Sequence, residues 1–228
     1  LGIDYKRPTS YPVGYIQYVD MLALNFREFL LAMDVSEDVI SFLRDCFTNV
    51  KPVPEAVHNK ILEYLRLYLA IGGMPDVVQT YSDTGDIVAA DKKQRSILED
   101  YKYDIAHYAA PDVKIKAENC YLSIPAQLSK DNHKFKYSIV EKGGNARKYS
   151  SSLDWLSAAD MIRFSYNTKN MKMPLENYKE ADNFRIYTTD IGMLTSMYDF
   201  SIKSRLIQNL PDESKGGLYE ALAADMLI

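Results

Sequence analysis

A cluster of basic residues between Ser129 and Tyr149 carries the strongest chemical signal in the sequence. Six lysines and arginines stand against two acidic residues, a local balance of +4 in a chain of net charge −4: Lys130, Lys134, Lys136, Lys142, Arg147 and Lys148 against Asp131 and Glu141. A chain that is acidic as a whole needs such a local patch to bind the phosphates of nucleic acid. The cluster therefore predicts a DNA-binding surface, and a solvated charged face without a ligand stays open as the alternative.

Other chemistries find no complete set of residues. The histidines, His58, His107 and His133, share no metal-ligand spacing with cysteines or carboxylates. Cys46 and Cys120 are far apart and predict neither a zinc site nor a disulfide framework. Asp100 and Asp104 fall on one helix face, but a paired-carboxylate site needs a partner from another element, so we expect them to be solvated. We predict no catalytic residue and no metal site.

The composition is typical of an ordinary globular chain. Its 228 residues are 47% apolar and 25% charged, which indicates one large domain or two small ones and excludes a disordered or fibrous chain. No apolar run approaches the ~18 residues that span a bilayer, and no leader opens the chain, so we expect a cytoplasmic protein with no membrane partner. Because the chain begins at Leu1 and stops within an amphipathic pattern at Ile228, we also expect a piece of a longer polypeptide.

The first half of the chain is predicted to be helical after one strand. Aromatic and β-branched residues over 15–24 favour the strand, and Asn25 with Glu28 predicts a capping box at the start of a helix. Further helices are predicted over 36–47 (with Val39, Ile40, Leu43 and Phe47 facing inward), 54–71 and 85–109. Gly72 and Gly73 end the helix over 54–71, since glycine takes a left-handed conformation without steric cost.

Shorter elements are predicted beyond Pro111, which stops the long helix. They are helices over 115–122 and 125–128, a half-buried strand with Phe135, Tyr137 and Ile139, a helix capped by Ser150 or Ser151 with Leu153, Leu156 and Ala159 inside, and strands over 162–166 and 184–187. This order is typical of a winged helix. We predict a mainly α fold: a helical domain with an N-terminal strand over 1–111, a winged-helix module with a small antiparallel β-ribbon over 112–200, and over 201–228 a linker and the first helix of a truncated region.

A winged helix would present its last helix, over 151–159, to a DNA groove. The predicted DNA-binding residues are Lys130, Lys134, Lys136, Arg147, Lys148, Ser151, Ser152, Lys169 and Lys172, the last two on the wing. Asp154 and Asp160 lie on or beside that helix and would repel phosphates. Trp155 has apolar neighbours and is expected in the core. Winged helices also dock on proteins, so a protein-interaction module stays open as the alternative.

Five segments of the chain resemble one family in the same order and at similar spacing. They are SYPVGYIQYVDMLALNFREFL (10–30), YLAIGGMPDVV (68–78), ILEDYKYDIAHYA (97–109), SIPAQLSKDNHKFKYSIV (123–140) and FRIYTTDIGML (184–194). The family is a set of bacterial and archaeal AAA-type ATPases in which a domain of unknown function follows the nucleotide-binding core. The resemblance implies a parent ATPase that binds ATP and Mg²⁺, with its core before Leu1, and makes that core and further subunits the expected partners.

The chain itself has no phosphate-binding loop of the form GxxxxGK[ST]. Met and Pro follow Gly72-Gly73, and Leu and Tyr follow Gly216-Gly217, so no lysine stands where a phosphate would need it. We therefore predict no nucleotide site and no cofactor in this fragment. Arg66, Arg95 and Arg147 are eligible by type as arginine fingers, and the resemblance assigns none of them.

The resemblance also extends to the last residues of the chain. GGLYEALAADML (216–227) is similar to the opening helix of a restriction-endonuclease-like segment, with Glu220 as its acidic residue. A nuclease site needs several carboxylates that converge on a metal. We therefore expect no nuclease activity from this chain, and a solvated carboxylate at a helix start is the alternative role of Glu220.

Overall fold

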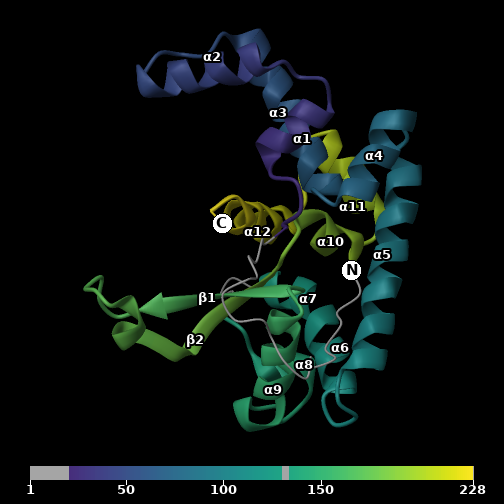
Figure 1. Cartoon of the computed structure of the whole chain (residues 1–228), viewed down its shortest axis with the longest axis vertical. Helices are drawn as coiled ribbons and strands as arrows, with labels where there is room; N and C mark the ends of the chain where they lie inside the picture. Colours follow the sequence, from purple (N-terminus) through teal and green to yellow (C-terminus); the bar gives the residue numbers. More distant parts are fainter. Residues whose placement is uncertain (1–20, 130–133, 228) are drawn as a thin grey trace, which may run out of the picture.

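The computed structural model describes residues 21–129 and 134–227, and in these ranges the protein is mainly α-helical with one small antiparallel sheet (Figure 1). The elements are α1 (Phe26–Ala32), α2 (Glu37–Thr48), α3 (Glu55–Ile71), α4 (Pro75–Thr84), α5 (Ile87–Tyr108), α6 (Lys114–Leu122), α7 (Ile124–Leu128), α8 (Tyr137–Val140), α9 (Ala146–Ala158), β1 (Ile162–Thr168), the 3-10 helix η1 (Leu175–Tyr178), β2 (Lys179–Thr188), α10 (Ile191–Ser196), α11 (Phe200–Ile207) and α12 (Lys215–Met226). The predicted mainly α class with a small antiparallel β-ribbon is confirmed. None of the helices in the described ranges is both long and apolar enough to cross a membrane.

The start of α1 is built as its sequence predicts. The Asn25 side chain accepts a hydrogen bond from the Glu28 amide at 3.0 Å, and the Glu28 carboxylate accepts one from the Asn25 amide at 2.9 Å. The strand predicted over 15–24 falls largely outside the described residues. Its described end, 21–24, has no regular secondary structure, but the Leu24 amide donates to the Gly73 carbonyl at 2.8 Å. That bond ties the entering chain to the α3–α4 turn.

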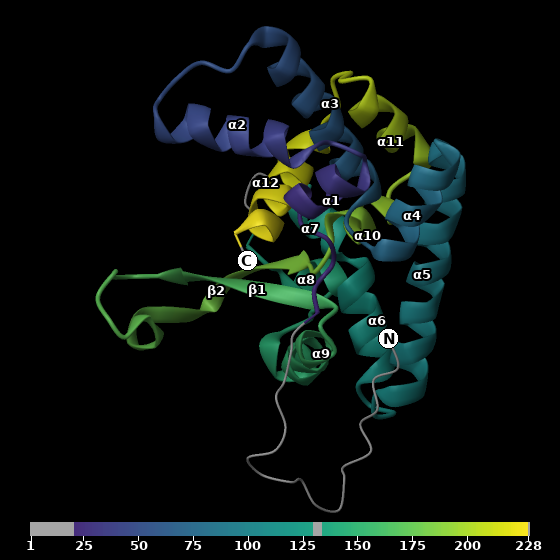
Figure 2. The same ribbon diagram turned by 45° about the horizontal axis from the view of Figure 1, so that its top comes forward.

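The helices before and after the small sheet share one hydrophobic core. The core runs from Phe29 in α1 to Leu222 in α12, and α10 packs against α3, α5 and α12 (Figure 2). The chain that follows β2 therefore returns to helices that precede Pro111. The division into domains near Pro111 and near residue 200 stays a prediction.

Helix α2 is present, but the prediction that Phe47 faces inward is wrong. Val39, Ile40 and Leu43 are only half-buried, Phe47 is 87% exposed, and Cys46 is the residue of this helix that is buried. Both views show α2 extending away from the other helices (Figures 1 and 2). The apolar side chains on the outer side of α2 therefore have few contacts with the rest of the described chain.

The two strands form an antiparallel ribbon, which we define as β1, β2 and residues 169–178 between them. Ile162 pairs with Thr188 and Tyr166 with Phe184, and the register shifts between Tyr166 and Thr168. The ribbon projects from the helices on the side where α2 projects, and α12 lies between them in both views (Figures 1 and 2). The strands predicted over 162–166 and 184–187 are thus confirmed and extended.

The strand predicted with Phe135, Tyr137 and Ile139 is wrong, because Tyr137 and Ile139 belong to helix α8. The Phe135 amide donates to the Phe184 carbonyl of β2 at 2.8 Å, as in a strand pair. The Gln127 side chain then takes both backbone groups of Lys136, at 2.9 and 3.0 Å. Since those groups are no longer available to a neighbouring strand, the pairing ends after Phe135.

Helix α9 begins earlier than predicted. Asn145, and neither Ser150 nor Ser151, is its cap, and the Asn145 side chain accepts from the Lys148 amide at 3.1 Å. Both serines lie inside the helix and are exposed. Trp155 is half-buried against the core, as expected of a packing residue.

Candidate nucleic-acid interface

The structure places most of the predicted DNA-binding residues at the surface of α8, α9 and the ribbon. The exposed ones are Lys136, Arg147, Lys148, Ser151, Lys169 and Lys172. Lys134 is half-buried, and Lys130 lies outside the described residues. The described residues of the basic cluster therefore lie in and beside α8 and α9, directly before the ribbon in the chain.

Ser152 is a correction to the predicted set. It is 0% exposed, and its hydroxyl donates to the Val113 carbonyl at 3.3 Å. A residue on the inner face of α9 cannot reach a phosphate. Ser151 and Arg147, four positions apart, lie on the outer face of the same helix.

Lys148 is paired with Glu141, at the start of the loop between α8 and α9. Its ammonium group pairs with the Glu141 carboxylate, which also accepts from the Tyr149 hydroxyl at 2.5 Å. The hydrogen bonds from Lys148 and then Tyr149 lower the pKa of Glu141, while burial and then Glu141 raise the pKa of Tyr149 to about 12. Lys148 therefore helps to fix the start of α9, and Arg147 beside it is the more available cation.

A polar hollow on the ribbon brings Lys134 together with residues that the sequence analysis missed. The hollow has a volume of about 320 Å³ and is lined by Lys134, Ser165, Tyr166, Asn167, Asn183, Phe184 and Arg185. Arg185 pairs with Ser165 across the ribbon, and Tyr166 is 36% exposed with the Lys179 ammonium 3.4 Å from its ring centre. Two cations, amide groups and an exposed aromatic ring are the groups that bind phosphates and bases.

Carboxylates also lie at this surface. Asp154 is exposed on α9, and Asp160, between α9 and β1, is 3.7 Å from Arg163. Glu180 accepts from Asn183 at 2.8 Å and from Asn167 at 2.6 Å, and these bonds, Asn183 first, lower its pKa. Glu180 is therefore charged at neutral pH and offsets part of the positive charge of Lys169, 3.7 Å away.

The base of the ribbon is fixed by Asp190, the residue that caps α10 two positions after β2. Asp190 is fully buried, and its carboxylate accepts from the Gly73 amide at 2.6 Å and the Met193 amide at 2.9 Å. Burial raises its pKa to about 7, against the opposing effect of the bond from Gly73. Gly72, at φ +72°, lies so close that an added Cβ would be 2.5 Å from this carboxylate. The glycine predicted to end α3 thus also makes room for Asp190.

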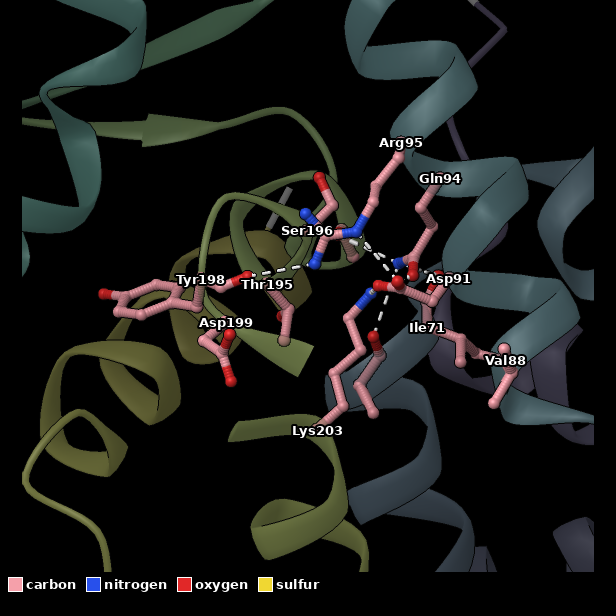
Figure 3. A network of polar contacts seen from close by, with 12 residues as sticks. Ile71, Val88, Asp91, Gln94, Arg95, Thr195, Ser196, Tyr198, Asp199 and Lys203 are labelled. Atoms are coloured by element: carbon pink, nitrogen blue, oxygen red, sulfur yellow. Dashed lines mark hydrogen bonds and ion pairs between the residues drawn. The ribbon is translucent and has the colours of Figure 1, made fainter. Parts of the chain in front are cut away.

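A second buried network joins α3, α5, α10 and α11 (Figure 3). Gln94 donates to the Ile71 carbonyl at 2.9 Å and the Gly192 carbonyl at 3.0 Å, and it accepts from Lys203. Lys203 is 0% exposed and lies 2.5 Å from Asp91, which is 2.8 Å from Arg95. We call these residues, together with Gly72, Gly73 and Asp190, the junction.

The charges of the junction compensate one another. Burial lowers the pKa of Lys203, and the bond to Asp91 acts in the opposite direction. Burial raises the pKa of Asp91, but the hydrogen bonds from Lys203 and Arg95 outweigh it and hold that pKa below its usual value. Arg95, eligible by type as an arginine finger, also donates to the Tyr198 carbonyl at 3.2 Å. The junction is therefore a structural network that holds α10, and through it β2, against α3 and α5.

Helix α12 contacts the ribbon through Glu220. Its carboxylate lies 2.6 Å from Arg185 and 2.5 Å from the Tyr187 hydroxyl. Asp225, farther along α12, accepts from the Tyr68 hydroxyl at 3.2 Å, and burial raises its pKa to about 6. In the part of the chain that the structure describes, no three histidine, cysteine or carboxylate residues are grouped to hold a metal ion.

The architecture and the exposed surface define a mainly α-helical protein with a projecting β-ribbon that carries cations on its outside and is anchored by buried charges. The chain belongs to a family described as a domain of unknown function (DUF8612), whose model matches residues 62–204. The matched residues run from α3 to α11 and include both the junction and the ribbon. Neither a curated protein nor a solved structure matches the chain.

Proposed function

We propose that this chain is the DNA-binding, regulatory region of a cytoplasmic AAA-type ATPase, without a nucleotide site of its own. The five segments that resemble such ATPases support the parentage. In this proposal, ATP and Mg²⁺ bind the parent's core, and the helices before Pro111 transmit the state of that core to the module after it.

The order of elements supports a winged-helix module. Helices α6, α7, α8 and α9 precede β1 and β2, and the Phe135–Phe184 hydrogen bond adds one residue of a third strand to the edge of β2. In a winged helix the last helix enters a groove and the ribbon lies beside it. Here α9 would be that helix, with Arg147 and Ser151 on its outer face.

The hollow on the ribbon is the observation that carries the proposal. It joins Lys134, from the basic cluster found in the sequence, with two asparagines and with Arg185, whose guanidinium also pairs with Glu220, next to the exposed Tyr166. Cationic groups bind the phosphate backbone independently of sequence, so the expected interaction is with DNA phosphates and is sensitive to salt.

Charge reversal tests the proposal. The triple variant Lys134→Glu, Lys136→Glu, Arg147→Glu is expected to bind a short DNA duplex at least about tenfold more weakly than wild type at low ionic strength. Fluorescence anisotropy at several salt concentrations measures affinity and its salt dependence. The control reverses Lys51, Lys60 and Lys92, which are exposed on or beside helices α2, α3 and α5, so that net charge is matched. Equal loss in both variants refutes this surface as the DNA-binding site, and no binding by wild type at low salt refutes DNA binding.

A protein-interaction module is the second candidate, with the ATPase core or another subunit as its partner. The exposed apolar side chains of Phe47 (87%) and Val50 (91%), at the end of α2, favour it. The two residues adjoin, because the Val50 amide donates to the Phe47 carbonyl at 3.2 Å, and contiguous exposed apolar patches mark docking sites. If the charge-reversal variant loses DNA but still assembles with the core, the two functions occupy different surfaces.

A further inference from the structure

Large apolar side chains lie exposed in the ribbon tip, which we define as residues 169–178. Met171 is 89% exposed, Met173 82% and Leu175 44%. Both views show this end of the ribbon pointing away from the helices (Figures 1 and 2). A group of apolar side chains at the end of a projecting arm indicates a contact with another molecule.

The surroundings of these side chains carry a small net positive charge. Lys169 and Lys172 belong to the ribbon tip and Lys179 follows it, whereas Glu176 lies in the tip and Glu180 follows Lys179, so that lysines exceed carboxylates by one over 169–180. Lys169 and Lys172 are exposed, and the ion pair of Lys169 with Glu180 is long, at 3.7 Å. The charge thus favours an anionic partner over an apolar protein surface.

The ribbon tip is held in shape by its own hydrogen bonds. The Lys169 amide donates to the Tyr178 carbonyl at 3.0 Å, and the Asn177 amide to the Pro174 carbonyl at 3.2 Å. The Thr168 hydroxyl donates to the Asn170 carbonyl at 2.7 Å. The methionines are therefore displayed on a closed turn, which reduces the entropy lost on binding.

We propose that Met171 and Met173 enter the minor groove of DNA and wedge against a base step, with Lys169 and Lys172 on the flanking phosphates. This inference rests on the proposed DNA binding and adds the groove and the mode of contact. A minor groove about 6 Å wide excludes a two-stranded ribbon but admits side chains from its end. Apolar side chains, methionine among them, partly unstack the bases that they enter.

The test uses the full chain and a short duplex in which 2-aminopurine replaces the adenine of a single TA step, a flexible step that unstacks readily. Wild type is expected to raise the 2-aminopurine fluorescence. Met171→Ser with Met173→Ser should abolish that rise and weaken binding about tenfold, with the same salt dependence, because no phosphate contact is lost. Lys169→Gln with Lys172→Gln should instead reduce the salt dependence. Met21→Ser, at an 88% exposed methionine far from the ribbon tip in sequence, is the matched control and should behave as wild type.

The outcomes separate this inference from the proposed function. If the double methionine variant binds the duplex and raises the fluorescence as wild type does, the wedge is refuted while DNA binding stands. If wild type binds no duplex at low salt, both fail. Sedimentation of wild type, but not of the methionine variant, with phosphatidylglycerol vesicles and no fluorescence response to DNA would overturn the wedge in favour of a lipid surface.

Discussion

The junction and the ribbon both contain a lysine paired with a carboxylate, yet the two pairs have different surroundings. The side chains of Lys203 and Asp91 are 0% and 9% exposed and lie 2.5 Å apart. Those of Lys169 and Glu180 are 75% and 24% exposed and lie 3.7 Å apart. Water screens the ribbon pair, so its charges remain available to a ligand, whereas the buried pair must stay together because either charge alone would be desolvated.

Two glycines repeat the contrast. Gly72 and Gly143 both have positive φ, +72° and +80°. A Cβ on Gly72 would lie 2.5 Å from Asp190, whereas a Cβ on Gly143, in the loop before α9, would meet nothing within 4 Å. The junction therefore constrains side-chain volume as well as charge. The surface around α9 constrains only the backbone.

The largest effect is expected from breaking the buried pair. Asp91→Ala leaves the Lys203 ammonium buried without its partner carboxylate, and should lower the free energy of unfolding by about 3–5 kcal/mol. Urea denaturation followed by circular dichroism measures the change. Replacing both partners, Asp91→Leu with Lys203→Met, should recover most of the loss, since no charge is then left buried. A double variant no more stable than the single one would contradict this explanation.

A smaller effect is expected from filling the space beside Asp190. Gly72→Ala combines an unfavourable positive φ with a steric clash, and should destabilise the protein by about 3 kcal/mol. Gly143→Ala has the backbone strain alone, and about 1 kcal/mol is expected. The same denaturation experiment compares them. Equal losses would show that Asp190 moves aside and that the junction is less constrained than its distances indicate.

The pH dependence of the free energy of unfolding should reveal the titration of Asp190. Its folded pKa of about 7 lies above the ordinary value of 3.8, so the folded protein binds the proton more tightly than the unfolded chain. This contribution is fully present below pH 3.8 and is lost as the pH rises through 7. Between pH 8 and 5 we expect the free energy of unfolding to increase by about 3 kcal/mol from Asp190.

Asp190→Asn should remove that part of the increase and leave the smaller part that Asp225 contributes around pH 6. Denaturation of both proteins at each pH isolates the difference. If the two proteins show the same pH dependence, another group is responsible, and burial does not raise the pKa of Asp190 in the folded protein.

Features fixed by neighbouring residues were predictable from the sequence. The Asn25–Glu28 capping box and the positive φ of Gly72 depend on groups within one helical turn, and both are present. The alternation around Phe135 predicted a strand, but Gln127 from another helix takes the backbone groups of Lys136. Contacts between distant elements decide such cases, and alternation alone contains no information on them.

In the candidate site, too, the residues that depend on sequence neighbours were predictable and those that depend on distant contacts were not. Lys134 was found because its neighbours in sequence are basic, whereas Arg185 was missed because it joins Lys134 only through the strand register that sets Arg185 opposite Ser165. Asp190 and Gly73 are bonded across 117 residues. Ser152 was wrongly assigned because it lies three residues after the buried Tyr149 and four before the buried Leu156, on the face of α9 that packs against α6.

The smallest effect on stability is expected in the ribbon, where Glu180→Gln breaks the exposed pair of the comparison. Glutamine keeps an oxygen for Asn167 or Asn183 but removes the negative charge next to Lys169. Because the ribbon pair is solvated, the free energy of unfolding should not change measurably. DNA affinity at low salt should instead rise about two- to threefold, as one repulsive charge is lost. Anisotropy and urea denaturation on the same preparation measure both, with Asp154→Asn on α9 as the matched removal of a surface carboxylate. If Glu180→Gln destabilised the protein as much as Gly143→Ala, the ribbon charges would be structural like those of the junction, and the cations there would not be available for phosphates.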